Sequence, residues 1–310
     1  MEKSYDYEMP RKIINSEGVY NFISLIWSTY KSKTNKIIYL DFKGTKVIEP
    51  NMMAPLGLIL TKIKSNKNKI FFRNLSKQMK SLLIENGFLS TNEYLNNEIP
   101  QNYISYMNFN GDDNNSFREY ILSQLREIKS SETIGLLISR LMEIFVNVKM
   151  HARYRISKNR FGDKEIFSSG AYYKSDNYLI FSIANNGLTF SQNIKSSIEL
   201  NYINESEYIN WAMQKSNTTR ETKCEGPGGL GLYLLLDLIK DCKGKIIIVS
   251  GKGFYRADGD KQLPYKVKEL NCEFPGTVVT VKVPIKDIEV NDEFNYNNEF
   301  NIYDLLKEEL

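Results

Sequence analysis

The stretch EIFVNVKMHA, Glu143–Ala152, places a glutamate, an asparagine and the only histidine of the 310-residue chain four residues apart. Each residue of an α-helix turns by about 100°, so Glu143, Asn147 and His151 would lie in one row along a helix. Apolar residues cluster on roughly the opposite side and predict a stripe that faces the core. The members of this stripe are Ile134, Leu137, Ile138, Leu141, Phe145 and Val148. The sequence therefore predicts an amphipathic helix with Glu143 and Asn147 turned away from the core.

The polar row has two interpretations. A solvated face is the usual place for polar residues on an amphipathic helix. Asn147, however, lowers helix stability between the β-branched Val146 and Val148, and carboxylate and amide oxygens are hard ligands that can hold Mg²⁺ with a water. His151 has no second histidine or cysteine pair with which to bind a metal, and no identified nucleophile to activate. We therefore expect His151 to pack and hydrogen-bond locally at the helix end.

Two glycine-containing segments lie downstream. GPGGLG, Gly226–Gly231, has G-x-G-x-x-G spacing, but the polar residues before it and the absence of an acidic residue about 20 positions later exclude a dinucleotide fingerprint. A Walker A loop is excluded because no Lys-Ser/Thr follows. A phosphate cradle opening a helix near Leu232 and a plain glycine-rich loop remain. IANNGLTF, Ile183–Phe190, ends a strand in Asn-Gly, which is normally a strong indication of a hairpin turn. The residues after it do not alternate, which weakens the hairpin interpretation and strengthens that of a loop whose backbone comes close to a ligand.

Farther from these motifs, alternating strand and helix patterns begin at residue 36 and indicate an α/β fold. The polar stretch 108–116 is the predicted linker. The second half predicts, in order, two helices, a hairpin turning at 174–177, a glycine loop with a helix and a strand over 226–251, and a last strand over 276–285.

The composition of the chain argues against several classes of function. The net charge of +4 is spread over the chain rather than gathered into a basic block, so nucleic acid is not implied. The longest apolar runs are too short to span a bilayer, and the charged start is no signal peptide. Cys224, Cys242 and Cys272 are an odd number at wide spacing, which suits neither a disulfide framework nor a zinc site and predicts a reducing cytoplasm.

Taken in order, these motifs resemble the GHKL ATP-binding superfamily, which includes gyrase, Hsp-type chaperones, histidine kinases and MutL. The resemblance covers residues 116–285 and implies the Bergerat α/β sandwich, with helices over a mixed, mainly antiparallel sheet. It implies that Glu143 is the general base and that Asn147 holds Mg²⁺ and contacts the nucleotide. The other nucleotide-binding positions that it implies are Asn185, Gly187, Thr189, Gly228, Gly229, Leu230, Gly231, Leu232 and Thr277. Arg220, in the lid segment before the glycine loop, is a candidate γ-phosphate contact from its charge and position.

The chain departs from the pattern of this family at several places. Asn185 stands where the adenine-reading aspartate belongs, and Thr189 replaces the second glycine of the D-x-G-x-G motif. An asparagine carbonyl can still accept a hydrogen bond from the adenine amino group, without charge. The lone His151 lies inside the helix motif, which excludes histidine autophosphorylation in cis. The E-x-x-x-N-x-x-x-H-[AG] form is similar to the anti-sigma-factor serine kinases, and its glutamate also to the hydrolysing gyrase and MutL branch.

The N-terminal region, over residues 36–90, resembles a STAS domain, the fold of anti-sigma-factor antagonists. The phosphoacceptor serine of that family falls at Asn51, so the region looks like a STAS fold without its switch residue, kept for protein contact. An unrelated small α/β domain is the alternative. The predicted division is a STAS-like domain over 1–115, a GHKL domain over 116–290 and an acidic tail over 291–310.

These resemblances imply a cytoplasmic, bacterial regulatory protein that binds ATP with Mg²⁺ and hydrolyses it slowly to switch protein contacts. A protein partner would bind through the STAS-like region, the lid at 188–227 or the tail. Neither a nucleic acid nor a membrane is implied as a partner. A homodimer is left open. Two alternatives stand beside this expectation. One is a serine/threonine kinase of the anti-sigma-factor type, and the other a non-catalytic nucleotide sensor or scaffold.

Overall fold

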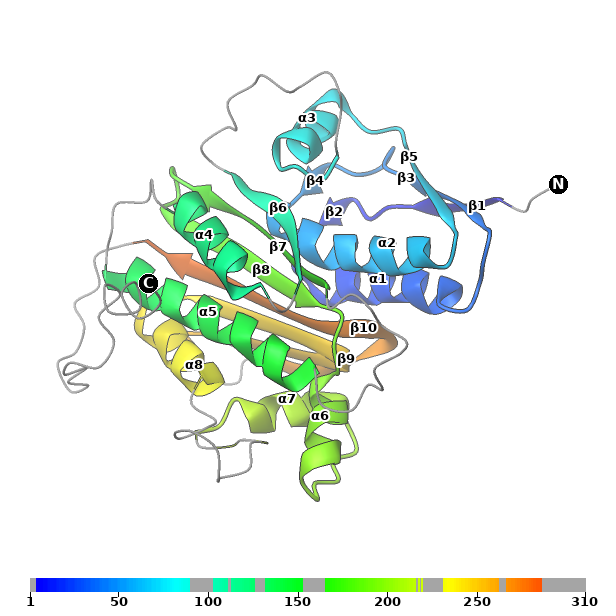
Figure 1. Ribbon diagram of the computed structural model, residues 1–310. Coiled ribbons are helices and arrows are strands. Elements are labelled where there is room, and N and C mark those ends of the chain that lie inside the picture. The colour runs from blue at the N-terminus through cyan, green and yellow to red at the C-terminus, as the bar shows by residue number, and fades with distance from the viewer. Residues whose placement is uncertain are drawn as a thin grey trace.

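The computed structural model describes residues 4–89, 103–110, 113–125, 132–152, 165–215, 217, 219, 231–261 and 266–285. Over these residues the chain is a mixed α/β fold built from two principal sheets and the helices that cover them (Figure 1). The α/β class expected from the alternating patterns is therefore confirmed.

The large sheet has five strands, each antiparallel to its neighbours. In spatial order these are β6 (Tyr103–Asn110), β7 (Glu165–Tyr173), β8 (Tyr178–Asn185), β10 (Lys266–Pro284) and β9 (Lys245–Asp258). The β7–β8 hairpin turns at residues 174–177, as predicted, and Asn177 adopts a positive φ of 50° there. Asparagine tolerates this conformation better than most residues, because its short polar side chain can hydrogen-bond locally.

Strand β9 reverses direction within its own length. Fourteen residues in one extended run would separate its ends by roughly 43 Å. Instead the N–H of Gly259 donates to the carbonyl of Gly244 at 2.8 Å, so the two ends lie side by side. Gly251 has a φ of +58° near the midpoint, which marks the place where the strand folds back.

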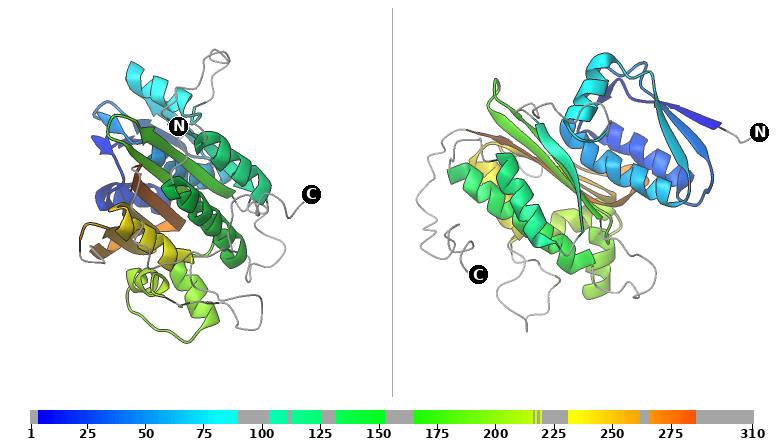
Figure 2. Two further views of the ribbon diagram at one scale, coloured as in Figure 1. Left: turned by 90° about the vertical axis from the view of Figure 1, so that its left-hand side faces the viewer. Right: turned by 45° about the horizontal axis from the view of Figure 1, so that its top comes forward.

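Among the helices that cover one face of the large sheet, here called the front face, are α4 (Asn114–Leu125), α5 (Glu132–Ala152) and α8 (Gly231–Asp241) (Figure 2). The apolar stripe predicted for α5 supplies much of this front core: Ile134, Leu137, Leu141 and Phe145 are buried, and Ile138 packs against them. The Phe145 ring stacks on Phe117 of α4, with 4.1 Å between ring centroids. Two short helices, α6 (Phe190–Ser197) and α7 (Glu205–Ala212), follow β8.

The N-terminal unit, residues 4–89, lies on the opposite, rear face of the large sheet (Figure 2). Its small sheet consists of three parallel strands, in the order β1 (Ser4–Glu8), β3 (Ile37–Asp41) and β5 (Lys69–Arg73). Its other elements are β2 (Lys12–Ile13), α1 (Glu17–Tyr30), β4 (Val47–Ile48), the 3₁₀ turn η1 (Pro50–Met52), α2 (Met53–Ser65) and α3 (Lys77–Glu85).

The rear core is shared between the N-terminal unit and the large sheet. Helices α1 and α2 lie between the two sheets, and residues of β7, β8, β9 and β10 belong to the same hydrophobic cluster as the small sheet. Small polar groups are hydrogen-bonded inside this contact. Ser169 Oγ of β7 donates to the Asn51 carbonyl at 3.0 Å and accepts from the Ala54 N–H at 2.8 Å. The N-terminal unit therefore docks on the sheet through its η1–α2 junction.

The structure corrects the sequence expectations at several places. The stretch 108–116 is not a linker, because Asn108–Asn110 end β6 and Asn114–Ser116 begin α4. Strand β6 falls within the range 1–115 that was predicted as the first domain, yet it pairs with β7 in the large sheet. Helices α1, α6 and α7 were not anticipated. The tail 291–310 lies outside the described residues.

Candidate functional site

Helix α5 carries the first part of the candidate site. The Glu143 side chain is 40% exposed and pairs with Arg140 one turn earlier, with 3.2 Å between Oε2 and the guanidinium nitrogen. The Arg140 side chain is only 12% exposed. Asn147, one turn further along, is half-buried. Both predicted residues thus lie off the buried stripe of α5, as the helical pattern requires.

The carboxylate of Glu143 meets the start of helix α8. Gly231 is the first residue of α8, and a Cβ added there would lie 3.1 Å from the Glu143 Cδ and 3.2 Å from each of its oxygens. A side chain at position 231 would therefore press on the carboxylate. The N-terminal end of a helix carries partial positive charge and free N–H groups, so it favours the negative charge that Glu143 places beside it. Two motifs separated widely in the sequence are brought together here.

A second part of the site lies across three adjacent strands, at the end of β8 and in the middle of β9 and β10. Asn185, Thr277 and Ser250 are neighbours across β8, β10 and β9 in the sheet register. Alternation along each strand puts them on the front face, because Ile183 of β8 and its counterparts on β10 and β9 two residues away belong to the front core. All three are buried. They form a polar row beyond the apolar front core.

Hydrogen bonds hold this polar row in place. Thr277 Oγ1 and Ser250 Oγ are 2.7 Å apart, and Ser250 Oγ accepts from the Phe190 N–H at 2.9 Å. The Asn185 amide is satisfied when its Nδ2 donates to the Thr277 carbonyl at 3.2 Å and its Oδ1 accepts from the Gly187 N–H at 3.0 Å. An aspartate at 185 could not donate to the Thr277 carbonyl. The contact therefore gives a physical reason for asparagine at this position.

The loop between β8 and α6 has its own anchors. Thr189, which is buried, caps α6: its Oγ1 accepts from the Gln192 N–H at 3.2 Å, and the Gln192 side chain accepts from the Thr189 N–H at 3.0 Å. This cap gives a physical reason for threonine at position 189. Lys62 of α2 donates to Asn186 Oδ1, so the N-terminal unit reaches the loop that follows Asn185.

Several predicted positions are placed elsewhere or lie outside the described residues. Leu232 packs partly against the front core. His151 belongs to the last turn of α5, and its side chain is outside the description. Predicted positions wholly outside the described residues are Arg220, Gly228, Gly229 and Leu230.

Sequence reasoning missed three residues that shape the site. Ser250 could have been found by reading every second residue back from it through Ile248 and Ile246, which places it on the same strand face. Gly276, with a φ of +137°, lets the chain pass so close to the Asn185 carbonyl that an added Cβ would lie 2.1 Å from that oxygen. No local pattern signals the contact of Lys62, which comes from an element far away in the sequence.

The side chains of the candidate site can be compared with what Mg²⁺ and a nucleotide would need. No group of three or more His, Cys, Asp or Glu suited to a metal occurs in the part of the chain that the structure describes. Mg²⁺ commonly keeps its waters and uses one or two protein ligands with substrate phosphates, so Asn147 with a nucleotide phosphate fits this ion. Asn185 Oδ1 accepts one N–H and has capacity for another, which suits an amino group on a base.

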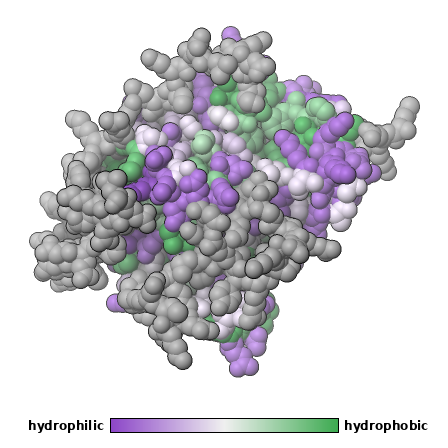
Figure 3. All heavy atoms as spheres, in the orientation of Figure 1, coloured by the Kyte–Doolittle hydropathy of each residue, from purple (hydrophilic) through white to green (hydrophobic). Residues whose placement is uncertain are grey.

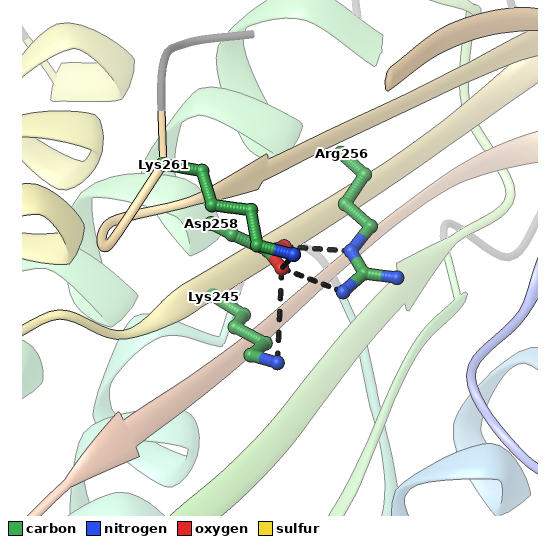
Figure 4. A network of polar contacts seen from close by, with 4 residues as sticks. All are labelled: Lys245, Arg256, Asp258 and Lys261. Atoms are coloured by element: carbon green, nitrogen blue, oxygen red, sulfur yellow. Dashed lines mark hydrogen bonds and ion pairs between the residues drawn. The ribbon is translucent and has the colours of Figure 1, made fainter. Parts of the chain in front are cut away.

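A second charged cluster lies away from these residues (Figure 4). The side chain of Asp258 is fully buried and receives two hydrogen bonds of 2.6 Å from Arg256, with Lys245 at 3.7 Å and Lys261 at 3.8 Å. Burial alone would raise the pKa of Asp258, but hydrogen bonds from Arg256 and the charges of these cations hold it below its usual value. Because Lys245 begins β9 and Asp258 ends it, the cluster closes the fold-back of that strand.

A search for membrane-crossing helices among the described residues finds none with the length and apolar character to span a bilayer. Comparison with models of known protein families gives no match, and comparison with curated proteins gives no related sequence.

Proposed function

We propose that this protein is a cytoplasmic regulatory ATPase that binds Mg-ATP on the front face of the large sheet and hydrolyses it slowly. The observation that carries the proposal is the meeting of Glu143 with Gly231 at the start of α8, on the face that also presents the polar row of Asn185, Thr277 and Ser250. Helices over one face of an antiparallel sheet support a Bergerat-type arrangement. Three parallel strands with helices on one side support a STAS-like N-terminal unit.

Each group has a role in this proposal. Asn185 and Thr277 orient the adenine, and Asn147 supplies a protein ligand to Mg²⁺. The free N–H groups at the start of α8 favour the phosphates. Glu143 accepts a proton from the attacking water while the oxygen of that water forms a bond to the terminal phosphorus and the bond to the leaving ADP oxygen breaks. The products are ADP and phosphate.

Phosphoryl transfer to a partner hydroxyl is the second candidate, since Glu143 could activate a serine in the same way as a water. The STAS-like unit of the same chain is a poor acceptor. Its switch position is occupied by Asn51, which has no hydroxyl and is fully buried against the rear face. A kinase of this form would need a separate protein as its substrate, and incubation with labelled ATP and candidate proteins should then label one of them.

The decisive first experiment is calorimetric titration with ATP, ADP and GTP in Mg²⁺, followed by a phosphate-release assay. Binding of adenine nucleotides with slow release of phosphate is expected. Tight binding without release would favour a nucleotide sensor. No binding of any nucleotide would overturn the proposal.

Replacing Glu143 by alanine should lower the rate of phosphate release by at least about 100-fold while ATP still binds, because a general base contributes that much or more. Glu119→Ala is a matched control, since Glu119 is an exposed glutamate on the neighbouring helix α4. Equal turnover in Glu143→Ala and wild type would show that the carboxylate only stabilises the start of α8.

A further inference from the structure

The ion pair between Arg140 and Glu143 differs from the other ion pairs of the described residues. The Arg140 side chain is the least exposed cation among them, at 12%, whereas the cations of the other pairs are between 30% and 47% exposed. A surface pair on a helix ordinarily keeps its long cationic side chain in water. Here the cation is covered, and its carboxylate partner is the more exposed of the two.

Most of the hydrogen-bonding capacity of this guanidinium is unused within the described residues. A guanidinium carries several N–H donors in a flat, fixed fork. Arg140 donates from Nη1 to Glu143 Oε2 at 3.2 Å, and no other hydrogen bond or ion pair joins it to a described residue. A mostly covered cation with so few partners is costly, so the remaining donors favour the approach of a further anion.

The guanidinium lies beside the place where the phosphates are proposed to bind. Glu143 Oε2 is 3.2 Å from the Arg140 nitrogen and 3.2 Å from the position of a Cβ added at Gly231. Arg140 and the start of α8 therefore flank the same carboxylate oxygen. Asn147, the proposed Mg²⁺ ligand, follows on the same side of α5 as Arg140, because a step of seven residues completes almost two helical turns.

The surroundings of this ion pair suit a charged ligand that brings its own negative charge. Figure 3 shows hydrophilic residues gathered over α4, which packs beside α5, while the apolar surface in this view lies mainly on the N-terminal unit. The polar row of Asn185, Thr277 and Ser250 is neutral. A phosphate chain beside the Glu143 carboxylate would be repelled unless a cation offsets the two negative charges. Arg140 is the described cation that contacts this carboxylate.

We propose that Arg140 is a further catalytic residue, which binds the γ-phosphate of ATP at the start of α8. This inference rests on the proposed function. One edge of the guanidinium holds Glu143, and its other N–H groups donate to the non-bridging oxygens of the γ-phosphate, whose geometry matches the planar fork. Because ADP has no γ-phosphate, Arg140 also makes the site bind ATP more tightly than ADP.

The role of Arg140 in the reaction follows from the movement of charge. The oxygen of the attacking water forms a bond to the γ-phosphorus, and a proton of that water passes to Glu143. The bond from this phosphorus to the oxygen that bridges to the β-phosphate breaks, and its electron pair stays on ADP. Arg140 keeps its protons throughout. It donates hydrogen bonds to the oxygens of the phosphoryl group in transfer and directs Glu143 toward the water.

Calorimetric titration of the full chain with ATP and with ADP, both in Mg²⁺, measures this discrimination. Arg140→Met should lower the affinity for ATP at least about tenfold and change that for ADP little, because charge-assisted hydrogen bonds to the γ-phosphate are lost. Phosphate release should fall about 100-fold. Arg140→Lys keeps the charge without the fork, so its preference for ATP should lie between those of wild type and Arg140→Met.

Arg73→Met is the matched control. Arg73 also pairs with a carboxylate, that of Asp6 at 3.3 Å, but it lies on the N-terminal unit. Its loss should leave the affinities for ATP and ADP and the rate of phosphate release unchanged.

A background that lacks the carboxylate separates phosphate binding from support of Glu143. Glu143→Gln should still prefer ATP to ADP, and adding Arg140→Met should remove that preference. An arginine that only holds Glu143 in place would make no difference in this background, and that result would overturn the inference. Equal losses of ATP and ADP affinity in both Arg140 variants would do the same. Wild type that binds no nucleotide would refute the proposed function itself, whereas wild-type discrimination and turnover in Arg140→Met would refute this inference alone.

Discussion

The two faces of the large sheet are covered by different parts of the chain. On the front face, α5 and α8 leave Glu143 half-exposed, and the polar row of Asn185, Thr277 and Ser250 extends beyond the apolar core. On the rear face, the N-terminal unit packs directly on the strands, and Asn51 is fully buried against Ser182. The same sheet thus has a buried polar row and a half-exposed carboxylate on one side, and a polar contact with the N-terminal unit on the other.

Asn51 shows how the rear face is closed. Asn51 Nδ2 donates to Ser182 Oγ at 3.1 Å, and the Asn51 carbonyl accepts from Ser169, so the η1 turn is used to join two parts of one chain. A protein partner that binds the N-terminal unit would have to use another surface, unless the rear contact opens.

The largest effect is expected from putting a charge into the rear contact. Asn51→Asp should lower the free energy of unfolding by about 3 kcal/mol at neutral pH, because a buried carboxylate without a cationic partner is costly. Burial raises the pKa of such an aspartate, so the loss should diminish as pH falls. Urea unfolding at neutral and at lower pH measures the loss of unfolding free energy and its dependence on pH. Asn35→Asp, the same change at an exposed turn, should have little effect, and equal losses in both variants would contradict a sealed rear contact.

A smaller loss of unfolding free energy is expected at the place where β9 folds back. Asp258→Asn should cost roughly 2 kcal/mol, because the hydrogen bonds to Arg256 lose their charge. The pKa of Asp258 is lowered in the folded protein, so its contribution is present above the unfolded pKa of about 3.9 and disappears as pH falls through the folded value. The free energies of unfolding of wild type and variant should become equal at acid pH. Asp260→Asn, in the adjacent exposed turn, is the control, and a difference that persists in acid would contradict the charge-based explanation.

The smallest effect is expected on the front face. Asn185→Asp should destabilise the free protein by about 1 kcal/mol, because a carboxylate oxygen would face the Thr277 carbonyl. A base that donates an amino hydrogen there would relieve the repulsion, so ATP should raise the melting temperature of this variant more than that of wild type. A smaller ATP-induced rise in the variant would indicate that position 185 does not face the base.

Much of the α/β pattern could be predicted from the sequence, since helix α5, the β7–β8 hairpin and the α8–β9 succession follow local periodicity and turn residues. Strand β6 could not, because its alternation is weak and Ser105, Asn108 and Asn110 interrupt its apolar residues. The docking of η1 on β7 and β8 joins Asn51 to residues more than a hundred positions away, and no local signal reports such a contact.

The candidate site was predictable to the extent that its residues sit on recognisable motifs. The spacing of Glu143 and Asn147 placed them off the core stripe of α5, where the structure has them. Spacing could not show that Glu143 would meet Gly231, since that contact depends on how α8 packs beside α5. Nor could it show that Thr189 would cap α6, because α6 itself was not expected.

Helix α1 packs against β10, and the N–H of Asn271 donates to the side chain of Asn21, a partner 250 positions away. The N-terminal unit leaves the ribosome long before β10 is synthesised. The apolar surface of α1 must then stay exposed until β10 follows, since a core of such high contact order closes late. Shortening the chain from its C-terminal side should therefore produce aggregation rather than a stable N-terminal fragment.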